Sequence, residues 1–322
     1  MASGAAGGSG LRVVELAPCL FAGLGPQGDS NAGFVLGPRG AVVIDAMQNE
    51  VLGRGLLDAV RAAGGYPIRV LVNTHYHGDH VFGNPAFPPG VEIVAHARSR
   101  AVMAQALAAA GVGPEQPLPE REIMELTFGA NLYDLVPESD PGREFFRWRF
   151  AAGGLAGARL RLPTLAVEGE CTFHLGERQM VLRHLGPGHT DGDLVVWFPD
   201  DEIVFVADLL FHGRFPWLGD SDVPAWITRL EEVARLGART VVPGHGEPVG
   251  VPEVLAFRDL LAALVEGAAA AARDGLDEAA ALEAVRLPAY AHLPRYKEWL
   301  PIAVRKLYRE AKLGELARGG GR

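Results

Sequence analysis

Cysteine is scarce in this chain of 322 residues, which contains only Cys19 and Cys171. Two cysteines cannot build a four-cysteine zinc site, and they argue against a disulfide framework. Long apolar runs are also missing, since no stretch approaches the roughly 20 residues of a membrane-spanning helix. Residues 1–10 have neither a basic start nor an apolar segment, unlike a secretory signal. We therefore expect a cytoplasmic protein with two free thiols.

Positive charge is in deficit. The chain has 30 Lys and Arg residues against 39 Asp and Glu residues, a formal net charge of −9. This balance argues against a nucleic-acid partner or an anionic membrane surface, although it allows a local basic groove. Apolar residues make up 48% and charged residues 21%, as in soluble globular proteins. We expect a small-molecule substrate, and a homo-oligomer is compatible with this composition.

What the chain does have is a concentration of metal-binding side chains at residues 75–80, which read HYHGDH. The segment follows the apolar run 68–73, which predicts a buried strand. Side chains two apart share a side in extended backbone but not on a helix. We therefore expect His75, His77 and Asp79 to share one side of a strand end or loop that turns at Gly78. A histidine-rich solvent loop is the alternative, but so many close titratable groups oppose one another without a metal.

Three further segments supply similar side chains. His189 lies in a glycine-rich turn, Asp208 follows the apolar run 203–207, and His245 follows a short strand. Each alone could be structural, but together they indicate a shared site. The seven candidate ligands are His75, His77, Asp79, His80, His189, Asp208 and His245. Seven exceed the needs of one metal, whereas two divalent ions sharing a carboxylate would use all of them. Imidazole and carboxylate favour zinc, with iron or manganese as alternatives.

Short β-like runs alternate with helical periodicity along the chain. We expect strands at residues 11–16, 32–36, 41–44, 68–73, 91–95, 165–167, 171–175, 179–184, 194–198, 203–206 and 240–242. We expect helices at residues 51–63, 97–110 and 222–236, and through most of the chain from residue 252. This order predicts two packed sheets with helices outside, an α/β (α+β) architecture.

Three regions depart from that rhythm. Residues 1–10 predict a disordered tail. Residues 111–163, here called the insertion, are broken by Pro and Gly and rich in aromatic residues. The insertion could be a lid over the site or a packing element without a direct role. Residues 251–322, here called the C-terminal extension, predict helices beyond a main domain of residues 11–250.

Residues 75–80 match the pattern His-x-His-x-Asp-His after a strand, and the later motifs follow in the same order. In these features, over about residues 12–250, the chain resembles the metallo-β-lactamase-fold superfamily. The resemblance implies an αββα sandwich with the metals at one edge. The ligand sets that it implies are His75, His77 and His189 for one metal, Asp79, His80 and His245 for the other, and Asp208 between them. It also implies that Asp45 lies beneath the histidine loop and orients a ligand.

Two divalent metals lower the pKa of bound water from about 15.7 toward about 7, which supplies hydroxide at neutral pH. We expect Asp79 to orient that water. Asp208 stands where classical β-lactamases mostly carry Cys or Ser, so the chain is more similar to the glyoxalase-II-like branch. The predicted activity is hydrolysis of an ester, thioester or lactone. The alternatives are a β-lactamase-like amide hydrolase, a mononuclear iron dioxygenase of the persulfide type, and a metal-binding module without catalysis.

Several other side chains have two interpretations. Arg214 could bind a carboxylate or be solvated, and His212 could enter the pocket. Aromatic residues that either wall the pocket or belong to the core are Phe211, Phe215, Trp217 and Trp226. Histidines expected to be structural or exposed are His96, His174, His184 and His292. Residues that either contact an acidic substrate or form the polar face of a helix are Arg305, Lys306, Tyr308, Arg309 and Lys312.

Overall fold

The computed structural model describes residues 4–5, 10–138, 140 and 142–316. The strands of the first sheet are β1 (Gly4–Ala5), β2 (Arg12–Ala17), β3 (Leu20–Leu24), β4 (Ala32–Gly37), β5 (Gly40–Ile44), β6 (Ile68–Val72), β7 (Glu92–His96) and β8 (Leu165–Val167). Those of the second sheet are β9 (Glu170–Leu175), β10 (Arg178–His184), β11 (Leu194–Phe198), β12 (Ile203–Phe211) and β13 (Thr240–His245).

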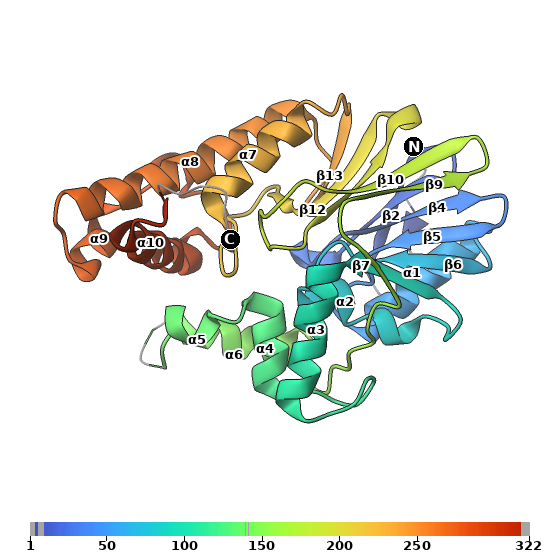
Figure 1. Cartoon of the computed structure of the whole chain (residues 1–322), viewed down its shortest axis with the longest axis horizontal. Helices are drawn as coiled ribbons and strands as arrows, with labels where there is room; N and C mark the ends of the chain where they lie inside the picture. Colours follow the sequence, from blue (N-terminus) through green and yellow to red (C-terminus); the bar gives the residue numbers. More distant parts are fainter. Residues whose placement is uncertain (1–3, 6–9, 139, 141, 317–322) are drawn as a thin grey trace.

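The helices lie outside the two sheets (Figure 1). They are α1 (Glu50–Ala62), α2 (Gly78–Val81), α3 (Ala97–Ala110), α4 (Glu120–Phe128), α5 (Leu132–Leu135), α6 (Arg143–Ala152), α7 (Val223–Ala234), α8 (Val251–Arg273), α9 (Glu278–Ala284) and α10 (Tyr296–Leu313). A short 3-10 turn, η1 (Pro26–Gly28), precedes β4. The predicted αββα sandwich is confirmed. Among the described helices, none has the length and hydropathy needed to cross a membrane.

Alternation along the strands builds the layers. On β4, Phe34 packs with Leu56 of α1 on the outer side of the first sheet. Its neighbour Val35 points the other way, into the core between the sheets. On β12, Phe205 belongs to that central core, while Val204 packs under the helices on the outer side of the second sheet. Successive side chains point to opposite faces of a strand, so each strand contributes to two apolar layers.

Parallel pairing places the ends of several strands at the same edge. β5 pairs parallel with β6, and β12 pairs parallel with β13. Neighbouring parallel strands finish side by side, so Asp45 after β5 lies near the segment that follows β6. In the same way Asp208 on β12 lies near His245 at the end of β13. The order of strands thus collects the candidate ligands before any side-chain contact is considered.

Away from the histidine segment, three differences from the sequence prediction concern the fold. β3 was not predicted, because Gly23 interrupts a short apolar run after a turn at Cys19, whose φ is 65°. The insertion, predicted only as an irregular region, contains α4, α5 and α6. Most of the tail 1–10 lies outside the described residues, but Gly4–Ala5 pairs antiparallel with β2.

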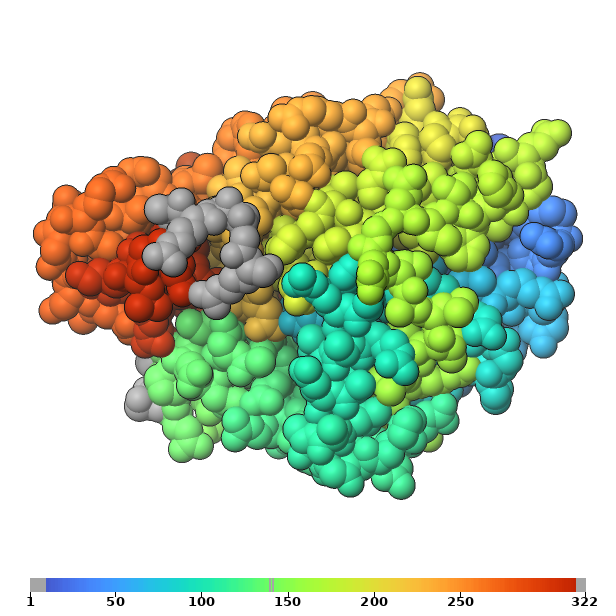
Figure 2. Space-filling model, in the orientation of Figure 1, coloured from blue at the N-terminus to red at the C-terminus, as the bar shows by residue number. Residues whose placement is uncertain are grey.

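The C-terminal extension rests on the insertion. Figure 2 shows the red α10 lying against the green insertion segment. Arg305 joins the two, with its Nη1 atom 2.8 Å from Asp140 Oδ2. Arg309 pairs with Glu278 at 2.7 Å, and the buried Lys306 donates to the carbonyl of Ser221 at 2.8 Å. These three basic side chains therefore hold helices and loops together, which leaves no support for the idea that they contact substrate.

Candidate metal centre

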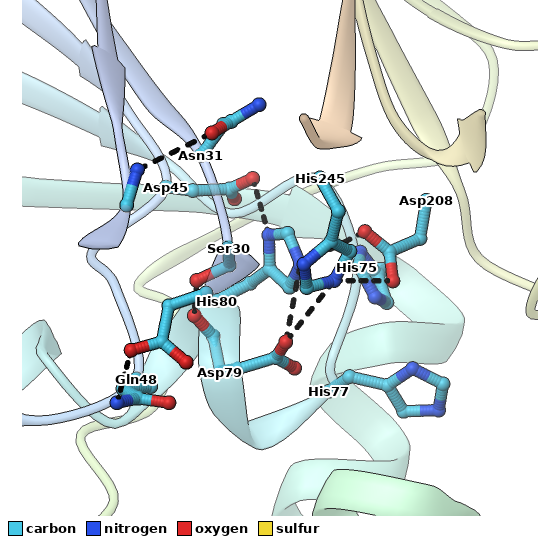
Figure 3. Close-up of polar contacts among 12 residues, drawn as sticks. Ser30, Asn31, Asp45, Gln48, His75, His77, Asp79, His80, Asp208 and His245 are labelled. Carbon is cyan, nitrogen blue, oxygen red and sulfur yellow. Dashed lines mark hydrogen bonds and ion pairs between the residues drawn. The ribbon is translucent and has the colours of Figure 1, made fainter. Parts of the chain in front are cut away.

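The structure brings all seven predicted ligands together at the edge where the strands end. Their potential ligand atoms form two groups, each within 4.8 Å. One group is His75, His77, His189 and Asp208, and the other is Asp79, His80 and His245. None of these residues is more than 9% exposed. Figure 3 shows Asp79 and Asp208 converging on His80 and His245.

The histidine segment divides between the groups because it changes conformation. His77 is extended, with φ −60° and ψ 141°, and α2 begins at Gly78. Asp79 and His80 are therefore helical, and the prediction that Asp79 shares a side with His75 and His77 is wrong. The backbone at Gly78 does not require a glycine conformation. Instead, a Cβ there would lie 2.2 Å from the Phe82 ring, so close packing excludes a side chain.

Asp45 lies beneath the segment, as the resemblance implied. Its Oδ1 accepts from the Thr74 amide, and its Oδ2 accepts from the Thr74 hydroxyl, both at 2.8 Å. Oδ2 also lies 2.8 Å from His80 Nδ1 (Figure 3). This contact fixes the ring so that His80 Nε2 faces Asp208, 3.0 Å from its Oδ1. A carboxylate behind a ligating imidazole fixes its tautomer and orientation.

Asp208 reaches the site through an irregularity in β12. The strand continues to Phe211, but its pairing with β13 shifts around Ala207. Ala207 has a φ of 45°, a left-handed conformation that costs a non-glycine residue energy. The irregularity turns Asp208 toward the site. On β13, a Cβ at Gly244 would lie 1.8 Å from Asp208 Oδ1, so glycine makes room for the carboxylate.

His189 lies in a turn after β10 that is stabilised by hydrogen bonds between residues of the turn. Asp193 accepts from the Thr190 hydroxyl at 2.5 Å and from the Thr190 amide at 3.0 Å. Burial raises the pKa of Asp193 to about 7, although these hydrogen bonds oppose the shift. The buried ring of Trp226 packs against His189, with ring centroids 5.1 Å apart. The turn and this ring together hold the imidazole at the edge of the site.

The donor atoms fit metal ions. His189 Nε2 lies 2.9 Å from His77 Nδ1 and 3.5 Å from Asp208 Oδ2. The buried His75 Nε2 has no hydrogen-bond partner among the described residues. Burial, reinforced by His80, lowers the pKa of His75 well below its ordinary value, and burial lowers that of His189 to about 3. Converging neutral imidazoles with buried, unpaired nitrogens are the ligands that zinc-type ions take.

The second group has the opposite electrostatics. Burial disfavours the charged form of His80, but the carboxylate of Asp208, followed by that of Asp45, outweighs it and raises its pKa well above the ordinary value. Asp208 likewise raises the pKa of His245 against burial. Burial opposes ionisation of Asp79, but His80 and His245 lower its pKa. The metal-free group therefore holds protons on histidine that a cation would displace.

A cavity of about 580 Å³ opens onto five of the ligands. Two of the four predicted wall residues, Phe211 and Trp217, line it, whereas Phe215 and Trp226 are buried in the core. Arg214 and His212 also line it. Two further segments supply the remaining walls. The insertion, predicted as either a lid or a packing element, contributes Phe145, Trp148 and Arg149 of α6, which supports a direct role at the site. Pro294, Arg295 and Trp299 near the start of α10 were not predicted.

Other histidines lie apart from the metal groups. His96 and His184 stack on each other, with ring centroids 4.0 Å apart. One contact near the site was missed from the sequence. Asp220 accepts a hydrogen bond from the Tyr76 hydroxyl, and its Oδ2 lies 3.8 Å from His77 Nε2. Asp220 lies in the loop between β12 and α7, away from the strand ends at which the sequence indicated ligands.

The fold and this ligand set define the class of protein. Residues 25–245 match the model of the Metallo-beta-lactamase superfamily, and the chain belongs to that family. Its seven convergent ligands are those expected of a metal-dependent hydrolase of this superfamily.

Among curated proteins, the chain is 33% identical over 93 residues to a metallo-beta-lactamase type 2 of Bacteroides fragilis, covering 27% of this chain and 37% of that protein. It is 22% identical over 279 residues to a linear primary-alkylsulfatase of Pseudomonas sp. (strain ATCC 19151), covering 82% of this chain and 51% of that protein. It is 30% identical over 93 residues to an acyl-coenzyme A thioesterase of Bos taurus, covering 27% of this chain and 33% of that protein. The chain thus spans about a third to a half of these relatives.

A solved metallo-beta-lactamase from Pontibacter korlensis has the same fold. It superimposes with a TM-score of 0.57 over 78% of this chain and 98% of the other, at 20% identity.

Proposed function

We propose that this protein is a dinuclear metal-dependent hydrolase of a small ester, thioester or lactone. The observation that supports it is the pair of ligand groups, which meet at Asp208 at the inner end of the cavity. Asp208 Oδ1 lies 3.0 Å from His80 Nε2, and its Oδ2 lies 3.5 Å from His189 Nε2. One carboxylate therefore contacts both groups, as a bridging ligand would. Zinc suits this mixture of ligands, with iron or manganese as alternatives.

When bound, the metals would acidify a water molecule and polarise the oxygen of the scissile bond. The chain supplies the remaining functions. Asp79 lines the cavity with its Oδ2 3.4 Å from His245 Nε2. Because the neighbouring histidines lower its pKa, Asp79 stays ionised and can accept a hydrogen bond from the attacking water. The buried position of the ligands limits access to substrates that fill the cavity.

The type of bond that is hydrolysed is inferred from the residue at position 208 and from the similarity to curated relatives. An aspartate at position 208 favours the thioesterase- and lactonase-like branch over efficient β-lactamases, and the similarity to an acyl-coenzyme A thioesterase agrees with that choice. A sulfate ester is a second candidate, which the similarity to an alkylsulfatase over 82% of this chain favours. Both bond types can use the same acidified water, but they differ in the atom attacked, which is the acyl carbon of an ester or thioester and the sulfur or alkyl carbon of a sulfate ester.

The test combines elemental analysis of protein purified without added metal, oxygen uptake, and a panel of thioesters, lactones, carboxylic esters and alkyl sulfates. We expect about two zinc-type ions per chain and turnover of a carboxylic ester or thioester without oxygen consumption. About one iron per chain with oxygen consumption would replace this proposal with a dioxygenase. Two bound metals with turnover of alkyl sulfates alone would select the second candidate.

A further inference from the structure

One wall of the cavity contains a guanidinium without a counter-ion. Arg214 Nη1 donates to the carbonyl of Gly28 at 2.8 Å, and His245 Nδ1 lies 3.0 Å from the same oxygen. Among the described residues, no carboxylate forms an ion pair with Arg214. Its Nε is buried and has no acceptor there. Arg214 as a whole is partly buried. A partly buried cation with an unpaired donor favours an anionic ligand.

A second unpaired donor lies on the same wall. The Nε1 atom of Trp299 is buried and finds no acceptor among the described residues. The Arg214 guanidinium carbon lies 4.8 Å from the centre of the Trp299 ring. Both side chains line the cavity. Buried donors are nearly always satisfied in native proteins, so two unsatisfied donors side by side indicate a ligand that supplies acceptor oxygens.

Aromatic rings continue from this wall along the cavity. Trp299 packs edge-on against Trp217 and Phe145, with ring centroids 5.6 Å and 5.9 Å apart. Phe145 in turn lies 5.9 Å from Trp148, which is 53% exposed. All four residues line the cavity. A large exposed aromatic ring at the end of an aromatic row provides a surface for an apolar ligand.

Two other arginines line the cavity. Arg149 lies 2.8 Å from Asp29, and the partly exposed Arg295 lies 3.5 Å from Glu298, with its guanidinium carbon 4.5 Å from the centre of the Phe145 ring. Among the described residues, Arg214 is thus the cavity arginine that has no carboxylate partner. Trp299 belongs to the C-terminal extension, outside residues 25–245 that match the superfamily. The extension thus completes a wall that the shared fold does not supply.

We propose that this wall selects amphiphilic anions, and this inference rests on the hydrolase function proposed above. The preferred substrate is an ester or thioester whose acyl chain ends in a carboxylate. That carboxylate binds Arg214 and the Trp299 indole, and the apolar part of the substrate lies along Phe145 and Trp148. Arg214 acts as a specificity residue, because it contacts the substrate away from the scissile bond.

Matched esters test the proposal by kinetics. The p-nitrophenyl monoester of adipic acid carries a terminal carboxylate, and p-nitrophenyl hexanoate has the same chain length without it. We expect Arg214→Gln to lower kcat/KM for the anionic ester about tenfold or more, the usual effect of losing a charge-assisted hydrogen bond. Arg214 Nη1 also lies 3.1 Å from Nδ1 of the ligand His245, so the neutral ester should lose some activity, and the selective wall requires that loss to be at least about fivefold smaller than the loss for the anionic ester. Arg214→Lys, which keeps the charge, should recover part of the loss. An equal loss for both esters would show that Arg214 only supports the loop at Gly28, and would overturn the proposal.

Calorimetric binding separates this inference from the proposed chemistry. The metal-loaded protein is titrated with 6-phenylhexanoate and with 6-phenylhexan-1-ol, neither of which can be hydrolysed. Trp299→Phe keeps a ring and removes the N–H donor, so it should weaken the acid selectively, as Arg214→Gln should. Arg235→Gln changes an exposed arginine on the end of α7 and serves as the control. Acid binding that is unchanged in both cavity variants would mean that only the metals hold the carboxylate, which refutes the selective wall. Selective weakening without hydrolysis of any ester would support the wall and refute the hydrolase.

Discussion

Asp45→Asn perturbs the second ligand group without touching a ligand. Asp45 is 2% exposed and receives three donors at 2.8 Å, two of them on Oδ2. An amide keeps one acceptor oxygen and presents its own N–H groups at the other position. The better orientation keeps the Oδ2 contacts to the Thr74 hydroxyl and His80, and leaves the Thr74 amide unpaired. An unsatisfied buried donor costs about 1–3 kcal/mol.

The expected magnitudes follow from that count. A loss of about 2 kcal/mol lowers Tm by about 3 °C in a chain of this length, given an unfolding entropy of roughly 2.1 cal/mol/K per residue. Because the neutral amide no longer anchors the His80 ring through a charged contact, affinity for the second metal should fall about 10- to 100-fold. The first metal has no ligand in contact with Asp45 and should keep its affinity.

The assay titrates metal-loaded protein with a chelator and measures both metals per chain, alongside calorimetric Tm values of the metal-free form. Asp58→Asn is the matched control, because Asp58 is exposed on α1 and pairs with Arg61 on the same helix. The variant at position 45 should lose one metal early and retain the other. Two metals released together, at wild-type chelator concentrations, would refute the orienting role assigned to Asp45.

Three further outcomes follow from the geometry. His77→Ala should remove the first metal and lower kcat at least about 100-fold, and near-wild-type turnover would contradict a metal-dependent mechanism. Gly244→Ala should displace Asp208, since a Cβ would lie 1.8 Å from its Oδ1, and metal content measured by elemental analysis should fall below two per chain. Acidification should release the second metal first. The pKa values of His80 and His245 are raised above the ordinary value of about 6.5, so protons already compete for them above that pH, while His189, with a pKa of about 3, stays neutral. Equilibrium dialysis at pH 8, 7 and 6 checks this order, and simultaneous release would contradict it.

The ligands could be found from the sequence because each lies near the end of an apolar run. Parallel strands finish at one edge, so runs far apart in the chain deliver Asp208 and His245 to one place. The helix at Gly78 could not be predicted, since four residues carry too little periodicity. It moves Asp79 away from His75 and His77, a division that only the resemblance implied.

The cavity walls were harder to foresee. The helices of the insertion could not be recognised, because they are short and give a weak hydrophobic periodicity, and because proline and glycine lie between them. Trp299 and Arg295 look like ordinary residues of an amphipathic helix in the sequence. They line the cavity beside the metal ligands because α10 packs back across the molecule. The local pattern of apolar and polar residues does not show where a helix packs in the folded chain. Arg214 was a candidate from the sequence, but the sequence alone could not distinguish an arginine that binds a carboxylate from one that is solvated.

The seven ligands are drawn from both sheets of the sandwich. His75, His77, Asp79 and His80 follow a strand of the first sheet. Asp208 and His245 belong to strands of the second sheet, and His189 lies in the turn between two of its strands. Bound cations would therefore add a connection between two halves that also meet through the apolar core and through hydrogen bonds such as that from Asn31 Nδ2 to the Pro243 carbonyl. Occupancy at 100 times the dissociation constant would add about 2.7 kcal/mol for each ion to the free energy of unfolding. Loss of the metals would thus lower the stability of the protein as well as its activity.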